Sequence, residues 1–106
     1  MPKYLIEVNY TLEGVKGLRA EGGSARVAAA TALIESLGGT VESFYFAMGE
    51  TDGYVITDMP DAASAAAASL AVNAGGGATT RTVALLTATE IDAAVAKNVL
   101  YRPPGN

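Results

Sequence analysis

The chain has 106 residues, half of them hydrophobic and 17% charged, with a formal net charge of −4. This length fits one domain with its own hydrophobic core, so we expect a single domain over residues 1–106. The acidic balance offers no basic stripe, so neither nucleic acid nor an anionic membrane surface is an expected partner. Without histidine or cysteine, Ser-His-Asp and Cys-His catalysis are excluded, and no metal or cofactor is expected.

The N-terminal segment begins directly with the alternation of a β-strand. Over residues 3–10 one side carries aromatic and aliphatic groups and the other is mixed, namely Tyr4, Ile6, Val8 and Tyr10 against Leu5, Glu7 and Asn9. The segment lacks the apolar stretch of a signal peptide. No part of the chain reaches the ~18 apolar residues that a membrane span needs. We therefore expect a cytoplasmic protein.

Two helices are predicted next. Thr11 is the expected N-cap of a short helix, and Ser24 that of a longer helix that runs to Leu37. The apolar stripe of the longer helix leaves Arg26 to one side. Gly38 and Gly39 then end this helix, because glycine permits a left-handed cap.

The segment 40–58 holds two runs rich in aromatic and β-branched residues, 41–48 and 54–58, on either side of a glycine-flanked turn. This pattern predicts a β-hairpin, which we place at the middle of the sheet. Strict alternation puts Val41 on the same side as Tyr45.

The rest of the chain adds a helix, a strand and a last helix. Asp61 is the predicted N-cap of an alanine-rich helix over residues 62–74, and a strand follows over residues 79–86. Thr87-x-x-Glu90 has the spacing of a capping box and opens a helix to Lys97. The order predicts a ferredoxin-like βαββαβ fold of class α+β, with one antiparallel sheet and a C-terminal helix.

Both faces of the predicted sheet are largely apolar, although right-handed crossovers bring the helices to one face only. An uncovered apolar face is improbable on a monomer, so we expect a homodimer or a higher oligomer. The alternative is that the last helix or the proline-rich tail folds back over the open face.

Candidate functional residues gather on neighbouring strands. Glu7 and Asn9 share one side of the first strand, and Arg81 on the last strand could meet Glu7 across the ladder. With the hydroxyls of Tyr45 and Tyr54, they are candidate ligand-binding residues, and Glu7, Asn9 and Arg81 are weak catalytic candidates. The simpler interpretation is a cross-strand ion pair and aromatic packing.

Two other features carry less chemistry. Glu50 and Asp52 at the hairpin tip could hold a cation, but solvated turn residues are the better interpretation. The run Gly75-Gly76-Gly77 leaves a helix and enters a strand, so it is not a phosphate-binding loop, which leads from a strand into a helix.

Taken together, these segments resemble the GYD-domain family of small bacterial and archaeal proteins over nearly the whole chain. The resemblance is carried by Tyr10-Thr11 with Gly14 and Gly17-Leu18, Glu42-Ser43-Phe44-Tyr45-Phe46, Gly49-Glu50-x-Asp52, Thr87-x-x-Glu90 and Tyr101-Arg102-Pro103-Pro104-Gly105. The run from Glu42 to Asp52 is the most specific part. The chain departs from the family pattern at Thr51, where relatives tend to have tyrosine.

The resemblance implies a dimeric α/β-barrel type of ferredoxin-like fold, whose wider relatives include cofactor-independent monooxygenases, lactone isomerases and ligand-sensing domains. The leading hypothesis is a small soluble homo-oligomer that binds a small, mostly apolar molecule between sheet and helices. The alternatives are a cofactor-independent monooxygenase- or isomerase-like enzyme with Glu7 as base, and a purely structural oligomer. A cavity beside Glu7 favours the enzyme, a cavity without a base favours binding, and a filled core favours the structural protein.

Overall fold

Four strands form one open antiparallel sheet in the order β2-β3-β1-β4 in the computed structural model, which describes residues 1–106. The strands are β1 (Lys3–Tyr10), β2 (Thr40–Phe46), β3 (Gly53–Asp58) and β4 (Ala78–Leu85). The α+β class and the single antiparallel sheet are thus confirmed. Because β1 pairs with β3 on one side and β4 on the other, β2 is an edge strand, and the prediction of a hairpin at the middle of the sheet was wrong for β2.

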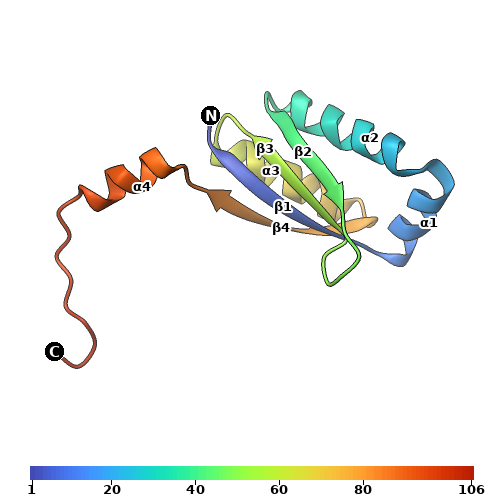
Figure 1. The fold of residues 1–106 in the computed structure, drawn as a ribbon. Helices are drawn as coiled ribbons and strands as arrows, with labels where there is room; N and C mark the ends of the chain where they lie inside the picture. Colours follow the sequence, from blue (N-terminus) through green and yellow to red (C-terminus); the bar gives the residue numbers. More distant parts are fainter.

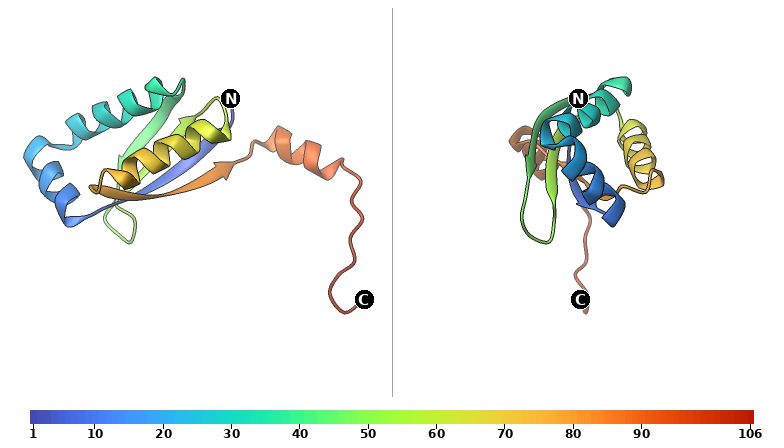
Figure 2. Two further views of the ribbon diagram at one scale, coloured as in Figure 1. Left: turned by 180° about the vertical axis from the view of Figure 1, so that it is seen from behind. Right: turned by 90° about the vertical axis from the view of Figure 1, so that its right-hand side faces the viewer.

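Three of the four helices lie on one side of the sheet (Figures 1 and 2). They are α1 (Leu12–Glu21), α2 (Gly23–Ser36) and α3 (Ala62–Ala74), and the face that they leave bare is called the open face below. The fourth helix, α4 (Ala88–Val95), follows β4 beyond the end of the sheet and leads into an extended tail (Figure 1). None of the helices has both the length and the apolar character that crossing a membrane requires.

Side-chain caps begin three of the helices as predicted. Thr11 Oγ1 accepts from Gly14 N at the start of α1, and Asp61 Oδ1 accepts from Ser64 N at 2.7 Å at the start of α3. Hydrogen bonds from Ser64 lower the pKa of Asp61, so the capping carboxylate stays ionised. At α4, Thr87 and Glu90 form the predicted capping box.

The predicted cap at Ser24 is wrong. The N-cap of α2 is Gly22, two residues before Ser24, and Gly22 has no side chain to accept a hydrogen bond, so the helix begins at Gly23. The chain turns between α1 and α2 within this one residue, whose φ of 87° is a conformation that favours glycine. The end of α2 follows the prediction, since Gly38 has a φ of 82°.

The pairing register decides which strand residues face the helices. Residues paired directly across the sheet share a face, so the row Tyr45, Tyr54, Glu7 and Arg81 lies together on the open face. The other residues of this face include Leu5, Asn9, Ile56, Val83 and Leu85. A β-bulge between Val41 and Ser43 reverses the expected orientation of Val41, which shares the helix-covered face with Phe44 instead of the open face with Tyr45.

The core between sheet and helices is small. Only 11 of the 106 residues are buried, and their apolar members form two clusters, Ile34, Met59, Ala65 and Ala68 in one and Val8, Val55 and Ala78 in the other. Thr57 of β3 is also fully buried, and its Oγ1 has no hydrogen-bond partner. A buried hydroxyl without a partner costs free energy, because folding removes its hydrogen bonds to water and the protein offers none in their place.

We expect Thr57→Val to raise the free energy of unfolding by about 1 kcal/mol, since valine has the same shape without the unsatisfied hydroxyl. Urea unfolding measures the change. Thr82→Val on the exposed part of β4 is the matched control and is expected to change stability by less than about 0.5 kcal/mol. A destabilised Thr57→Val variant would mean that the hydroxyl finds a partner in solution.

Candidate functional site

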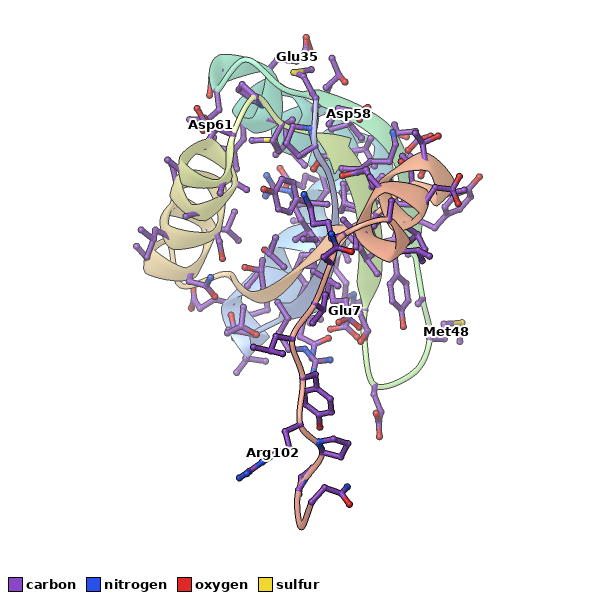
Figure 3. All side chains as sticks on the ribbon, turned by 90° about the vertical axis from the view of Figure 1, so that its left-hand side faces the viewer. Glu7, Glu35, Met48, Asp58, Asp61 and Arg102 are labelled. Atoms are coloured by element: carbon purple, nitrogen blue, oxygen red, sulfur yellow. The ribbon has the colours of Figure 1, made fainter.

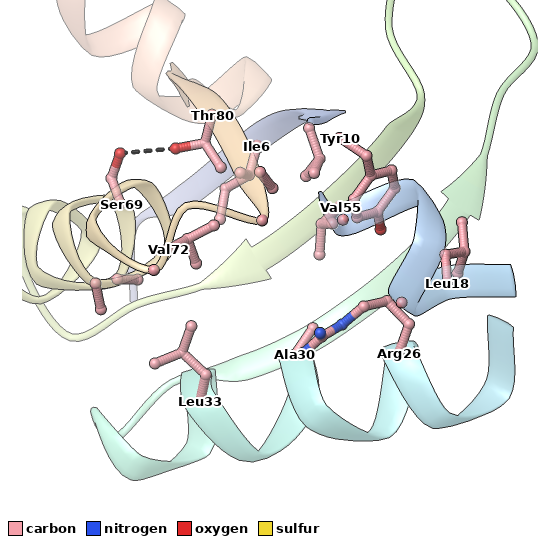
Figure 4. A pocket seen from close by; sticks show the side chains of 18 of the residues that line it. Ile6, Tyr10, Leu18, Arg26, Ala30, Leu33, Val55, Ser69, Val72 and Thr80 are labelled. Atoms are coloured by element: carbon pink, nitrogen blue, oxygen red, sulfur yellow. Dashed lines mark hydrogen bonds between the residues drawn. The ribbon is translucent and has the colours of Figure 1, made fainter. Parts of the chain in front are cut away.

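A pocket of about 490 Å³ lies between the helix-covered face of the sheet and helices α1, α2 and α3 (Figure 4). Its walls are mainly apolar, and the sheet and all three helices contribute to them, with the apolar residues Ile6, Val8, Phe44, Val55, Leu18, Leu33, Ile34 and Val72 among the lining. The pocket therefore lies between two layers of the fold, the sheet and the helices, and is not formed by a single loop.

The composition of α3 explains why this space is unfilled. Ala65 and Ala68 are buried against the sheet, but Leu70, one of only two bulky apolar residues of the helix, is 71% exposed. Alanine side chains are too short to fill the gap between two layers. Val72 alone of the large α3 side chains lines the pocket.

One wall of the pocket is backbone from the glycine run. Thr11 Oγ1 donates to Gly76 O at 2.7 Å, and Thr11 N donates to Gly77 O at 3.1 Å, so the start of α1 is bound to the start of β4. Gly14 lies so close that a Cβ atom there would be 1.8 Å from Gly77 O. The carbonyl oxygens of these glycines thus accept hydrogen bonds from Thr11.

Six polar side chains interrupt the apolar lining, namely Tyr10, Glu13, Glu21, Arg26, Ser69 and Thr80, and four of them form two groups. Tyr10 and Arg26 lie toward one end of the pocket, and Ser69 and Thr80 toward the other (Figure 4). Ser69 Oγ and Thr80 Oγ1 are 2.8 Å apart, and Asn73 Nδ2 donates to Thr80 Oγ1 at 2.9 Å. This second group is therefore satisfied within the protein.

The first group keeps hydrogen-bonding capacity. The nearest charge to the Arg26 guanidinium is Glu21 Oε1, at 3.7 Å from Nη1, which is longer than a good hydrogen bond. Burial raises the pKa of the Tyr10 hydroxyl, and the charge of Arg26 opposes this rise. Tyr10 therefore remains a protonated donor at neutral pH, beside a guanidinium with free N–H groups.

Arg26 corrects a sequence prediction. The apolar stripe was expected to leave it aside, but Arg26, Ala30, Leu33 and Ile34 all line the pocket. Their spacing of i, i+4, i+7 and i+8 puts them on one face of α2. A charged residue in register with an apolar stripe is the signal that could have identified it.

The predicted site residues lie elsewhere. None of Glu7, Asn9, Tyr45, Tyr54 and Arg81 lines the pocket, because each belongs to the open face. Figure 3 shows Glu7 on the sheet, apart from α3. The alternation of the first strand decides this, since Ile6 and Val8 turn toward the helices and Glu7 turns away.

The structure does bring most of these residues together. Glu7 pairs across the sheet with Tyr54 on one side and Arg81 on the other, and Arg81 Nη2 is 3.6 Å from Glu7 Oε1. Thr51 Oγ1 donates to the same carboxylate oxygen at 3.4 Å. The orientation of Arg81, which the sequence left open, is thus toward Glu7 as a cross-strand ion pair. Arg81 is largely exposed, so this pair is weak.

Asn9 and Asp52 have a structural task at the hairpin. Asn9 Oδ1 accepts from Asp52 N at 3.1 Å, and Asp52 Oδ2 accepts from Tyr10 N at 2.9 Å. The expectation that Asp52 is a solvated turn residue was wrong, because it binds the 47–52 loop to the end of β1. No group of three His, Cys, Asp or Glu side chains is placed to hold a metal ion.

Comparison of the sequence with models of known protein families identifies one family that matches most of the chain. The family model described as GYD domain matches residues 4–95, which include all four helices and, apart from Lys3, all four strands, and it confirms the resemblance drawn from the sequence. Neither a comparison with curated proteins nor one with solved structures gave a match.

Proposed function

For a chain that belongs to the GYD domain family, we propose a homo-oligomeric, ferredoxin-like domain of the dimeric α/β-barrel type that binds a small, mostly apolar molecule between sheet and helices. The observation that carries this proposal is the pocket of about 490 Å³ with largely apolar walls. Ligand sites of proteins measure about 300–1,000 Å³ and combine apolar walls with a few polar groups.

The polar groups of the pocket suggest the form of the ligand. Its apolar body would lie among Ile6, Val55 and Leu33, and a hydrogen-bond acceptor or an anionic group would meet Arg26 and Tyr10. A guanidinium offers five N–H donors and binds carboxylates and similar groups in two-point fashion. We therefore favour an amphiphilic ligand with one acidic end.

The alternatives have less support. The enzyme hypothesis made Glu7 the base beside a cavity, and Glu7 lies on the other face of the sheet from this pocket. The purely structural hypothesis expects side chains to fill the space that the pocket occupies. Binding is the hypothesis that needs a cavity without a positioned base.

Oligomerisation has support from the open face. Leu5, Ile56, Val83 and Leu85 share this face with Tyr54 and with Tyr45, which is 72% exposed. The helix that could have covered it, α4, stands beyond the end of the sheet (Figure 1). A second copy would bury this apolar surface.

The test uses the fluorescent probe 1-anilinonaphthalene-8-sulfonate, an apolar ring system with one anionic group. Ala30→Trp places an indole in the pocket and is expected to weaken probe binding about tenfold or more. Ala29→Trp, on the exposed side of the same helix, is the matched control and is expected to bind as the unchanged protein does. Equal binding by both variants would remove the pocket as the site.

A second variant separates the two ends of the ligand. Arg26→Gln is expected to weaken binding of the sulfonate probe about tenfold, because the charge-assisted contact is lost. The uncharged probe N-phenyl-1-naphthylamine has no anionic group, so its affinity is expected to stay the same. Loss of both affinities would instead indicate that the pocket itself has changed shape.

A further inference from the structure

The segment of residues 86–106, called the C-terminal arm, makes no hydrophobic contact with the rest of the chain that buries it. Every residue of the arm is exposed, although six of them are large and apolar: Leu86, Ile91, Val95, Val99, Leu100 and Tyr101. The arm leaves the body at the end of β4, and Figure 3 shows Arg102 far from the sheet. A segment with this composition is expected to have a partner.

The dimensions of the chain support the same conclusion. Its accessible surface is 7144 Å², whereas a compact monomer of 10.7 kDa exposes about 5,500 Å². The radius of gyration is 16.9 Å, against roughly 13 Å for a compact domain of this length. The excess surface of about 1,600 Å² is more than the ~800 Å² per partner that a specific interface needs.

The arm is poorly placed to cover the open face of its own chain. Only Leu86 and Thr87 connect β4 to α4, and Thr87 is extended, with φ −76° and ψ 164°. The capping box then fixes the helix start, since Thr87 N donates to Glu90 Oε1 at 3.0 Å and Glu90 N donates to Thr87 Oγ1 at 3.1 Å. A return of α4 over the sheet would need a reversal within these two residues, neither of them glycine, while Thr87 keeps the extended backbone that the capping box requires.

We infer that two copies of the chain exchange their C-terminal arms, so that the apolar residues of each arm contact the open face of the other copy beside the contact between the two sheets in the proposed barrel. Each copy has an uncovered apolar arm and an uncovered apolar sheet face. In a dimer with a two-fold axis, the arm and the sheet face of each copy are both buried, and the assembly is closed. The inference rests on the proposed oligomer but not on the ligand pocket, which lies on the other face of the sheet.

The first test changes the arm within the full chain. Ile91→Glu with Val95→Glu puts two charges on one side of α4, since the residues are one turn apart. This pair is expected to raise the dimer dissociation constant about 100-fold or more in sedimentation. Thr89→Glu with Ala93→Glu has the same spacing and charge on the other side of α4, and is expected to leave the dissociation constant within about threefold. Equal effects of the two pairs would overturn the inference.

The second test asks which chain the arm touches. The sequence has no cysteine, so Lys97→Cys gives a single site for a nitroxide label. This labelled chain is mixed with an isotopically labelled chain that has no nitroxide, so that any broadening of its amide signals arises between chains. We expect broadening at open-face positions Leu5 and Ile56, and none when the nitroxide is placed at Ala28→Cys on the outer side of α2.

Dimers without this broadening would overturn the exchange while leaving the oligomer intact. A chain that stays monomeric at micromolar concentration would overturn both the exchange and the proposed oligomer. Neither result changes the probe-binding difference between Ala30→Trp and Ala29→Trp, so failure of the arm exchange is distinguishable from failure of the proposed ligand site.

Discussion

Gly14→Ala will lower the free energy of unfolding by about 2 kcal/mol, whereas the same change at Gly17, in the same helix, will raise it by up to about 1 kcal/mol. A Cβ atom on Gly14 would lie 1.8 Å from Gly77 O, and both partners are backbone, so neither can move aside cheaply. At Gly17 nothing lies within 4 Å of the added atom. There only the helix propensity of alanine acts.

Thermal unfolding of the two variants checks this prediction. A net difference of about 3 kcal/mol corresponds to melting temperatures that differ by at least about 10 °C for a domain of this size. The Gly14→Ala variant is also expected to bind the sulfonate probe more weakly, because α1 must move away from the glycine run that forms a wall of the pocket. Similar melting temperatures would show that α1 does not approach Gly77 closely.

Met59→Ala will cost about 3 kcal/mol, a large part of the stability of a domain with so small a core. The Met59 side chain is fully buried in a cluster with Ile34, Ala65 and Ala68. Two of its three buried neighbours are alanines, whose short side chains can fill little of the cavity that the substitution leaves.

The chain offers the same substitution as its own control. Met48 lies in the 47–52 loop and is fully exposed, so Met48→Ala is expected to change the unfolding free energy by less than about 0.5 kcal/mol. The midpoints of urea unfolding compare the two variants. A Met59→Ala variant as stable as Met48→Ala would mean that the cluster around Met59 is not the core of the domain.

The fold was predictable where local chemistry decides it. The caps at Thr11, Asp61 and Thr87 depend on atoms within three residues, and the strand alternation of residues 3–10 depends on nearest neighbours. The failures at Ser24 and Val41 have another origin. The tight turn at Gly22 and the bulge in β2 depend on how segments distant in the chain pack together. The residues next to Ser24 and Val41 in the sequence do not indicate that packing.

The pocket was less predictable than the fold, because it results from missing side-chain volume. Polar residues on strands, such as Glu7 and Asn9, were predicted as site residues from the sequence. The pleat of the strand turns their side chains away from the helices and the pocket. The pocket exists because α3 offers alanines where larger residues would fill the space, and Arg26 and Tyr10 gain importance only once that space is seen. A role for the open-face residues in ligand binding remains a prediction.

The bulge in β2 has a consequence for how copies of the chain can associate. An edge strand with regular, unpaired backbone groups invites lateral addition of further strands and so open-ended polymerisation. Here the extra residue interrupts that regularity near Glu42, which also forms an ion pair with Lys3 at 3.1 Å. Growth by strand addition at this margin is thereby discouraged.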